Sequence, residues 1–212
     1  MRNRSRLRSN GSCPVRSRVL RVGAAAVLCA LGGCRSAPVS FPAPAPWEVR
    51  RPQLQAREHF DLSGRVAVAT GHEGFNANLH WEQQGTRSQL MLEGPLGTGA
   101  VQISASGNDL DIVTARGEHV DSAAAHADLA TRLGFDPPLR SLRYWILGVP
   151  DPAQPATEEL DERQQRLQGL TQAGWHIDYS LYVAVGGESL PARLTLRRDA
   201  VRVRLLVDDW QL

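Results

Sequence analysis

Apolar and polar residues alternate along most of the chain after position 58, which is the period of a half-buried β-strand. Glycine, asparagine and charged residues separate the alternating stretches at short intervals, as tight turns do. The pattern predicts strands at 60–68, 75–81, 88–94, 100–105, 110–114, 166–171, 174–183, 191–198 and 201–210. Hairpins in this order predict an antiparallel sheet with one apolar face. Nine or more such strands in one sheet should curl strongly or approach closure as a barrel.

A helical pattern interrupts the strands between 114 and 166. Asp121 can cap a first helix, in which Ala125, Leu129 and Leu133 recur every four residues. Gly134 ends this helix.

A second helix begins at Asp136-Pro137, with Asp136 as its N-cap and Pro137 at the first helical position, and it ends at Gly148. Apolar residues surround most of its last turn, so it must be covered on more than one side. The segment 121–148 is therefore either a plug of solid core at one end of the sheet or a lid over a hydrophobic cavity. The apolar face of the second helix consists of Leu139, Leu142, Trp145 and Ile146.

The N-terminal 33 residues have the pattern of an export signal. Residues 1–21 carry seven arginines and no acid, and residues 22–31 are an apolar run too short to span a bilayer. Cys34 directly follows two glycines, as in the bacterial lipobox, in which the cysteine is acylated after cleavage. The alternative is an ordinary signal peptide that contains a cysteine by chance.

Prolines break up the segment that follows Cys34, and it has no apolar period. The predicted organisation is a lipoprotein signal peptide at 1–33, a lipidated proline-rich tether at 34–57 and one folded domain at 58–212, with its helical lid at about 121–148. Cleavage before Cys34 removes seven of the 24 basic residues and none of the 22 acidic ones, so the formal charge changes from +2 to −5. The mature chain then has no basic stripe for nucleic acid and no second cysteine for a disulfide.

No catalytic motif is recognisable in the mature part of the chain. It has no Gly-x-Ser-x-Gly elbow, no His-Glu-x-x-His and no phosphate-binding loop, and its histidines are scattered. We therefore expect no enzyme activity, no cofactor and no metal. A membrane-spanning barrel is disfavoured because several strands are shorter than about 9 residues and aromatic residues make up only 6% of the chain.

A set of motifs in register with the predicted strands resembles the LolB family of outer-membrane lipoprotein receptors. They are GRVAV, LHWEQQG, LMLEGPLGTG, LRYWILGVP, GWHIDYSLY, LPARLTL and a terminal VDDW. The resemblance implies a mainly β (α+β) fold, an unclosed antiparallel β-barrel (half-barrel) with an inserted helical lid over a hydrophobic cavity. It also implies a monomeric protein that faces the periplasm from the outer membrane, accepts lipoproteins from the periplasmic carrier LolA, holds their acyl chains and inserts them into that membrane.

The predicted cavity-lining residues are the inward-facing apolar positions of the strands, together with the apolar face of the second helix. The strand residues are Phe60, Leu62, Phe75, Leu79, Trp81, Leu90, Leu92, Ile103, Trp175, Ile177 and Tyr179. From the residues alone, a filled core remains the alternative for each of them. A lipid-modifying enzyme, another lipid-binding envelope lipoprotein and a passive envelope scaffold also remain alternatives to lipoprotein transfer.

The turn Gly94-Pro95-Leu96-Gly97 carries an apolar residue at its tip, where turn chemistry favours Asn, Asp or Ser. By the resemblance, Leu96 matches the leucine of a protruding loop that acts in delivery to the membrane, and Pro95 and Gly97 flank it. Burial of one leucine is worth about 1.5 to 3 kcal/mol, far less than an acyl anchor, so Leu96 touches the bilayer rather than holding the protein there. The alternative is that Leu96 folds back onto the rim of the sheet.

Overall fold

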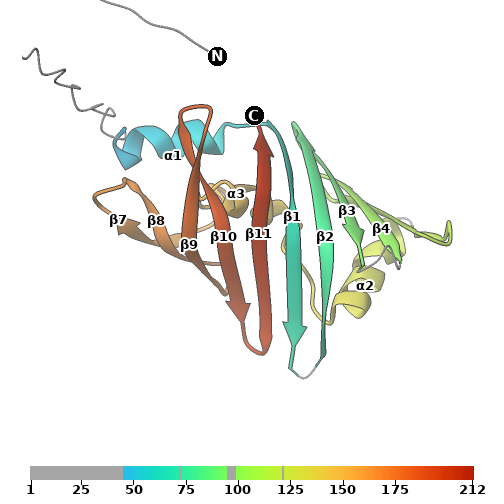
Figure 1. The fold of residues 1–212 in the computed structure, drawn as a ribbon. Coiled ribbons are helices and arrows are strands. Elements are labelled where there is room, and N and C mark those ends of the chain that lie inside the picture. The colour runs from blue at the N-terminus through green and yellow to red at the C-terminus, as the bar shows by residue number, and fades with distance from the viewer. Residues whose placement is uncertain (1–44, 72, 95–98, 121) are drawn as a thin grey trace, which may run out of the picture. The chain divides into compact units, whose positions relative to one another are not determined.

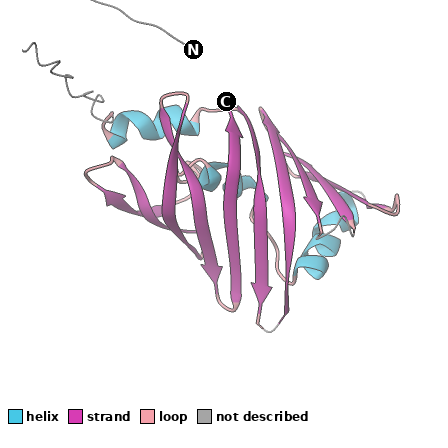
Figure 2. Ribbon diagram, in the orientation of Figure 1, coloured by secondary structure: helices cyan, strands magenta, loops and turns pink. Residues whose placement is uncertain are grey.

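The described part of the chain forms one antiparallel sheet of eleven strands together with three helices (Figures 1 and 2). The computed structural model describes residues 45–71, 73–94, 99–120 and 122–212. The strands are β1 (His59–Thr70), β2 (Glu73–Gln84), β3 (Arg87–Glu93), β4 (Ala100–Ser106), β5 (Asp109–Thr114), β6 (His119–Val120), β7 (Ala156–Asp161), β8 (Arg166–Gln172), β9 (Trp175–Val185), β10 (Glu188–Arg198) and β11 (Val201–Gln211). The helices are α1 (Trp47–Gln55), α2 (Ser122–Leu133) and α3 (Leu139–Ile146). No described helix is long and apolar enough to span a membrane.

The strands follow the order β6-β5-β4-β3-β2-β1-β11-β10-β9-β8-β7, and every neighbouring pair is antiparallel. Strands β6 and β7 each pair on one side only, so the sheet does not close within the described residues. The nine predicted strands correspond to β1–β5 and β8–β11. The predicted fold, an unclosed antiparallel sheet with inserted helices, is therefore confirmed.

Strands β1 and β11 join the two ends of the folded chain at the middle of the sheet. Their register shifts by one residue between Ser63 and Gly64. A Cβ atom at Gly64 would lie 2.2 Å from the backbone oxygen of Leu206. Because no side chain tolerates that distance, only glycine permits the two strands to approach this closely.

Helices α2 and α3 lie on the same face of the sheet, behind it in Figure 1. We call this the inner face and the opposite one the outer face. Alternation along each strand directs apolar side chains to the inner face, where they form the hydrophobic core with the two helices. The fully buried large side chains of the core include Leu62, Leu110, Ile112, Trp145, Ile146, Leu167, Leu170, Trp175, Ile177 and Leu190.

Helix α1 corrects the predicted end of the tether at residue 57. It begins at Trp47 and packs on the folded domain, with Trp47 and Leu54 buried in the core. The buried guanidinium of Arg50 donates hydrogen bonds to the backbone oxygens of Gln165 (2.5 Å) and Ser189 (3.1 Å). The proline-rich composition predicts an extended tether here and misses the helix, because tertiary contacts stabilise a helix that its own sequence disfavours.

Strands β6 and β7 are absent from the prediction. Most of the acidic run at 158–162 lies in β7. Glu158 accepts a hydrogen bond from the indole Nε1 of Trp47 (2.6 Å) and pairs with Arg51 (2.9 Å). These partners come from α1, more than 100 positions earlier in the chain, so no local pattern reveals them.

Helix α3 begins at Leu139, later than predicted, and Pro138 rather than Asp136 occupies the N-cap position. No side chain caps the helix. Two consecutive prolines allow the chain to turn into the helix without leaving an unpaired donor at either position, because proline has no backbone N–H. The predicted cap of α2, Asp121, lies outside the described residues.

Candidate functional site

An apolar cavity of about 100 Å³ lies between the inner face of the sheet and the helical segment 129–146. Every residue that lines it is apolar. Strands β1, β2, β3, β4, β9, β10 and β11 form one wall, and α2, α3 and the connection between them form the other. Such a cavity offers no group that could bind a polar ligand, and it excludes water in favour of hydrocarbon.

Ten of the fifteen predicted residues line this cavity. They are Phe75, Leu79, Trp81, Leu90, Leu92, Ile103, Leu139, Leu142, Ile146 and Trp175. The strands bring the first six and Trp175 together from positions up to 100 residues apart because all of them point to the inner face. Their role as a binding surface remains a proposal.

Five predicted residues do not line the cavity and belong to solid core instead. They are Phe60, Leu62, Trp145, Ile177 and Tyr179. Phe60 packs edge-on against Trp210 (5.7 Å between ring centroids) and against Trp81 (5.8 Å). Alternation assigned these side chains to the correct face, but it does not show how far along each strand the cavity extends.

Among these five residues, Trp145 is the one that polar contacts hold most clearly in place. Its side chain is fully buried, and its Nε1 donates a hydrogen bond to Gln172 Oε1 (2.7 Å). The hydroxyl of Tyr179 donates to the backbone oxygen of Trp145 (2.9 Å). Burial raises the pKa of Tyr179 well above its usual value, so this hydroxyl stays protonated and remains a donor. Trp145 therefore links α3 to the sheet.

Several lining residues were absent from the sequence prediction. They are Val66, Val68, Leu129, Leu133, Phe135, Pro137, Pro138, Leu194, Leu196, Val203 and Leu205. Those on β1, β10 and β11 alternate with arginines or with small residues, and that alternation could have identified them. Phe135 and the two prolines lie in the connection between the helices, where no periodicity identifies a buried side chain.

The connection between α2 and α3 closes one side of the cavity. Gly134, with a positive φ of 76°, lies beside Thr70 at the end of β1, where an added Cβ would be 3.5 Å from the Thr70 Cβ. The ring of Phe135 meets Trp175 edge-on, with 5.6 Å between their centroids. The ring contact is a van der Waals contact.

Leu96 lies in the sequence between β3 and β4. The backbone N–H of Gly94 donates to the backbone oxygen of Gly99 (3.1 Å), which closes the base of this hairpin. Pro95, Leu96 and Gly97 lie outside the described residues, as does Cys34.

The structure assembles one polar group that sequence reasoning missed. The hydroxyl of Thr171 lies 3.1 Å from His176 Nδ1, and His176 Nε2 lies 3.3 Å from Asp178 Oδ1. Asp178 is also paired with Arg197. All of these side chains are partly exposed on the outer face, where water competes for each hydrogen bond, so we interpret the group as a surface network. Within the described residues, no group of three or more His, Cys, Asp and Glu side chains has the arrangement of a metal site.

An unclosed antiparallel sheet with helices over an apolar cavity defines a half-barrel protein with a LolA-like fold. A solved structure of a LolA superfamily protein from Nitrosomonas europaea shares this fold, with a TM-score of 0.51 and 11% identity over 79% of this chain and 94% of its own. The family model described as outer membrane lipoprotein LolB matches residues 58–210, and the chain belongs to this family.

Two curated relatives agree with this assignment. The outer-membrane lipoprotein LolB of Nitrosococcus oceani is 33% identical over 86% of this chain and 92% of its own length. The outer-membrane lipoprotein LolB of Alkalilimnicola ehrlichii is 31% identical over 93% of this chain and 98% of its own length. The predicted class is thereby confirmed: the chain is an outer-membrane lipoprotein that faces the periplasm and acts as a receptor in lipoprotein transport, not an enzyme.

Proposed function

We propose that the apolar cavity receives the acyl chains of a lipoprotein delivered by the periplasmic carrier LolA, and that the chain passes this lipoprotein to the outer membrane. The observation that carries the proposal is a cavity without any polar lining residue beneath a helical cover. Each methylene removed from water is worth about 0.8 kcal/mol, so one C16 chain is worth on the order of 12 kcal/mol. A carrier-to-receptor transfer must keep such chains out of water at every step.

The size of the cavity implies that it opens when it is filled. Its volume of about 100 Å³ is smaller than the roughly 150 Å³ that holds one benzene molecule in an engineered apolar cavity. An acyl chain has many more carbon atoms than benzene. Part of the wall must therefore move away from the sheet before cargo is accommodated.

The contacts indicate which part moves. Helix α3 is held by buried hydrogen bonds: Ser141 donates to Asp151 Oδ2 (2.8 Å) and Trp145 to Gln172 (2.7 Å). By contrast, the segment 129–138 lies over the cavity through apolar side chains. An inserted acyl chain can replace apolar contacts but cannot replace a buried hydrogen bond. We therefore assign the moving cover to α2 and the connection that follows it, while α3 stays on the sheet. This moving cover is a shorter segment than the lid predicted from the sequence, which spans about 121–148.

A disulfide across the closed cover tests this assignment. The Cβ positions of Thr70 and Gly134 are 3.5 Å apart, at the short end of the range for disulfides. The variant Thr70→Cys/Gly134→Cys is made in the full mature chain with Cys34→Ala, so that no third thiol interferes. The carrier LolA, loaded with a triacylated lipoprotein, is mixed with the receptor, and co-purification of lipoprotein with the receptor measures uptake.

The oxidised receptor should take up less than a tenth as much lipoprotein as the same receptor after reduction. The reduced form is the matched control, because it carries the same strain from a side chain at the positive φ of position 134. Thr70→Ser/Gly134→Ser, treated with the same oxidant, controls for damage to the carrier. Equal uptake by the oxidised and reduced receptor would show that this cover does not open.

Two parts of the proposal concern residues outside the described structure. Acylation of Cys34 anchors the domain, and the mass of the mature protein should exceed its polypeptide mass by that of the attached chains. Leu96 meets the bilayer when cargo is released. A wild-type mass without acyl groups would contradict the anchoring.

A further inference from the structure

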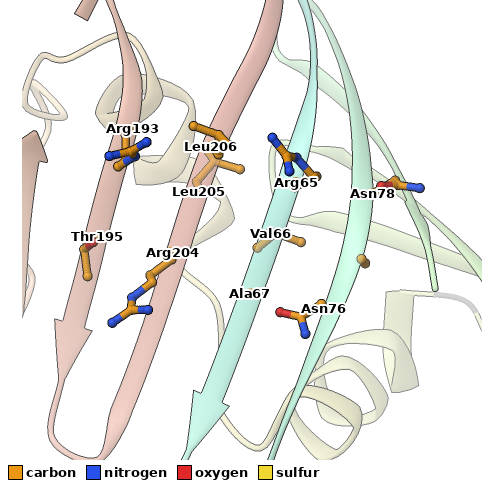
Figure 3. Close-up of a pocket in the computed structure, with 11 residues that line it drawn as sticks. Arg65, Val66, Ala67, Asn76, Asn78, Arg193, Thr195, Arg204, Leu205 and Leu206 are labelled. Atoms are coloured by element: carbon orange, nitrogen blue, oxygen red, sulfur yellow. The ribbon is translucent and has the colours of Figure 1, made fainter. Parts of the chain in front are cut away.

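Five arginines gather on the outer face of the sheet, opposite the cavity. Three of them surround the hollow in Figure 3. Two of the five lie on β10, two on β11 and one on β1, and the alternation that directs leucines to the inner face directs these side chains outward. We call this surface the outer arginine face; it consists of Arg65, Arg193, Arg197, Arg202 and Arg204.

The strand register brings these charges close together. Arg197 lies directly opposite Arg202, while Arg193 and Arg65 lie on either side of Leu206. Residues directly opposite on neighbouring strands have Cβ atoms about 5 Å apart, and like charges there destabilise a sheet. The fold therefore bears an electrostatic cost on this surface that a bound anion would remove.

Acidic side chains balance only part of the charge. Arg65 makes two hydrogen bonds to the carboxylate of Asp208 (2.9 and 3.1 Å), and Arg197 pairs with Asp178. Arg193, Arg202 and Arg204 make no ion pair with any residue that the structure describes. Short side chains, among them Ala67, Asn76 and Thr195, leave a shallow hollow of about 640 Å³ between the arginines. Free guanidinium groups around a hollow are suited to phosphate oxygens.

We propose that the outer arginine face docks on the phosphate headgroups of anionic phospholipids in the membrane that anchors the protein. As an outer-membrane lipoprotein, the chain is always close to a bilayer surface. One apolar side chain of β9 extends the face: Leu181 is 43% exposed and lies opposite Arg193. Exposed apolar side chains beside arginines are typical of surfaces that rest on a bilayer.

The position of this face has a consequence for transfer. The cavity and its cover lie on the inner face, so a domain that rests on the membrane by its outer face turns the cavity toward the periplasm. A carrier can then reach the cover without displacing the docked surface. The proposal goes beyond lipoprotein transfer itself, because it concerns how the receptor is oriented while it waits for cargo.

Vesicle flotation tests the docking. The full mature chain with Cys34→Ala is mixed with vesicles of pure phosphatidylcholine or with vesicles that contain 30% phosphatidylglycerol, at low and high salt. Wild type should float with the anionic vesicles at low salt only, because salt screens the attraction. Arg193→Gln/Arg204→Gln should bind about 30-fold more weakly, since each arginine near an anionic surface contributes about fivefold.

The control is Arg116→Gln/Arg163→Gln, which removes the same charge from exposed positions in two turns away from this face. It should float as wild type does. An equal loss of vesicle binding in both double variants would show that only net charge matters. Equal binding of wild type to both kinds of vesicle would show that headgroup charge is not recognised. Either result overturns the proposal. If Arg193→Gln/Arg204→Gln floats normally but accepts lipoprotein from LolA more slowly, the face docks a protein, and the proposal is also wrong.

Discussion

Gln172 is the residue whose replacement best tests how α3 is held on the sheet. Its side-chain oxygen accepts hydrogen bonds from Trp145 Nε1 (2.7 Å) and from the backbone N–H of Asp151 (2.8 Å). Its side-chain nitrogen donates to the backbone oxygens of Asp151 and Gln154, both at 2.9 Å. Gln172 is only 2% exposed, so one amide group satisfies four groups of the loop and helix around it.

Gln172→Leu keeps the volume of the side chain and removes all four bonds. Gln154 is exposed, so water replaces the bond to its backbone oxygen at little cost. The backbone oxygen of Asp151 keeps its hydrogen bond from the backbone N–H of Gln154 (3.3 Å). The indole N–H of Trp145 and the backbone N–H of Asp151 stay buried without a partner, and each costs about 1 to 3 kcal/mol. Burial of the leucine offsets part of this loss. We expect the free energy of unfolding to fall by about 3 kcal/mol, a large share of the 5 to 15 kcal/mol typical of a domain.

Urea denaturation followed by circular dichroism measures this change, with Gln168→Leu as control. Gln168 lies on the same strand but is exposed, and its one hydrogen bond, to the backbone oxygen of Leu160, is long at 3.3 Å. The control should change the stability by less than about 0.5 kcal/mol. A loss below 1 kcal/mol for Gln172→Leu would refute the argument that buried hydrogen bonds hold α3, and with it the choice of α2 as the moving part.

Three further predictions concern α1, the buried tyrosines and the loop. Arg50→Ala should detach α1 and lower the unfolding free energy by about 3 kcal/mol, because two backbone oxygens lose their donor, whereas the control Arg51→Ala should lower it by less than about 1 kcal/mol. Limited proteolysis would show the detachment of α1, and urea titration would measure the loss of stability. Burial raises the pKa of both Tyr179 and Tyr182 in the folded protein above the unfolded value near 10, so neither tyrosine changes the stability well below pH 10, and above it each should lower the unfolding free energy by about 1 kcal/mol per pH unit. Tyr182→Phe, measured by denaturation from pH 9 to 11, should therefore remove about half of that slope. Leu96→Glu should leave uptake from LolA unchanged but block insertion into vesicles, and normal insertion would exclude a delivery role for this loop.

The period-two alternation determined most of the sheet. It predicted nine of the strands and the face to which residues such as Leu79 and Ile103 point, because burial of every second side chain is a local property of a strand. The helical pattern likewise predicted α2 and α3. The quoted motifs identified the family, since they occur in a fixed order along the strands.

Tertiary structure alone decided what each inward residue does. Phe75 and Phe60 have the same alternation, yet Phe75 lines the cavity and Phe60 packs against Trp210, because the helices cover only part of the inner face. The sequence likewise does not show that Trp145 is held by Gln172, or that α1 belongs to the domain rather than to the tether. Those outcomes depend on partners 27 or more than 100 positions away, and no local periodicity carries information about contacts at that separation.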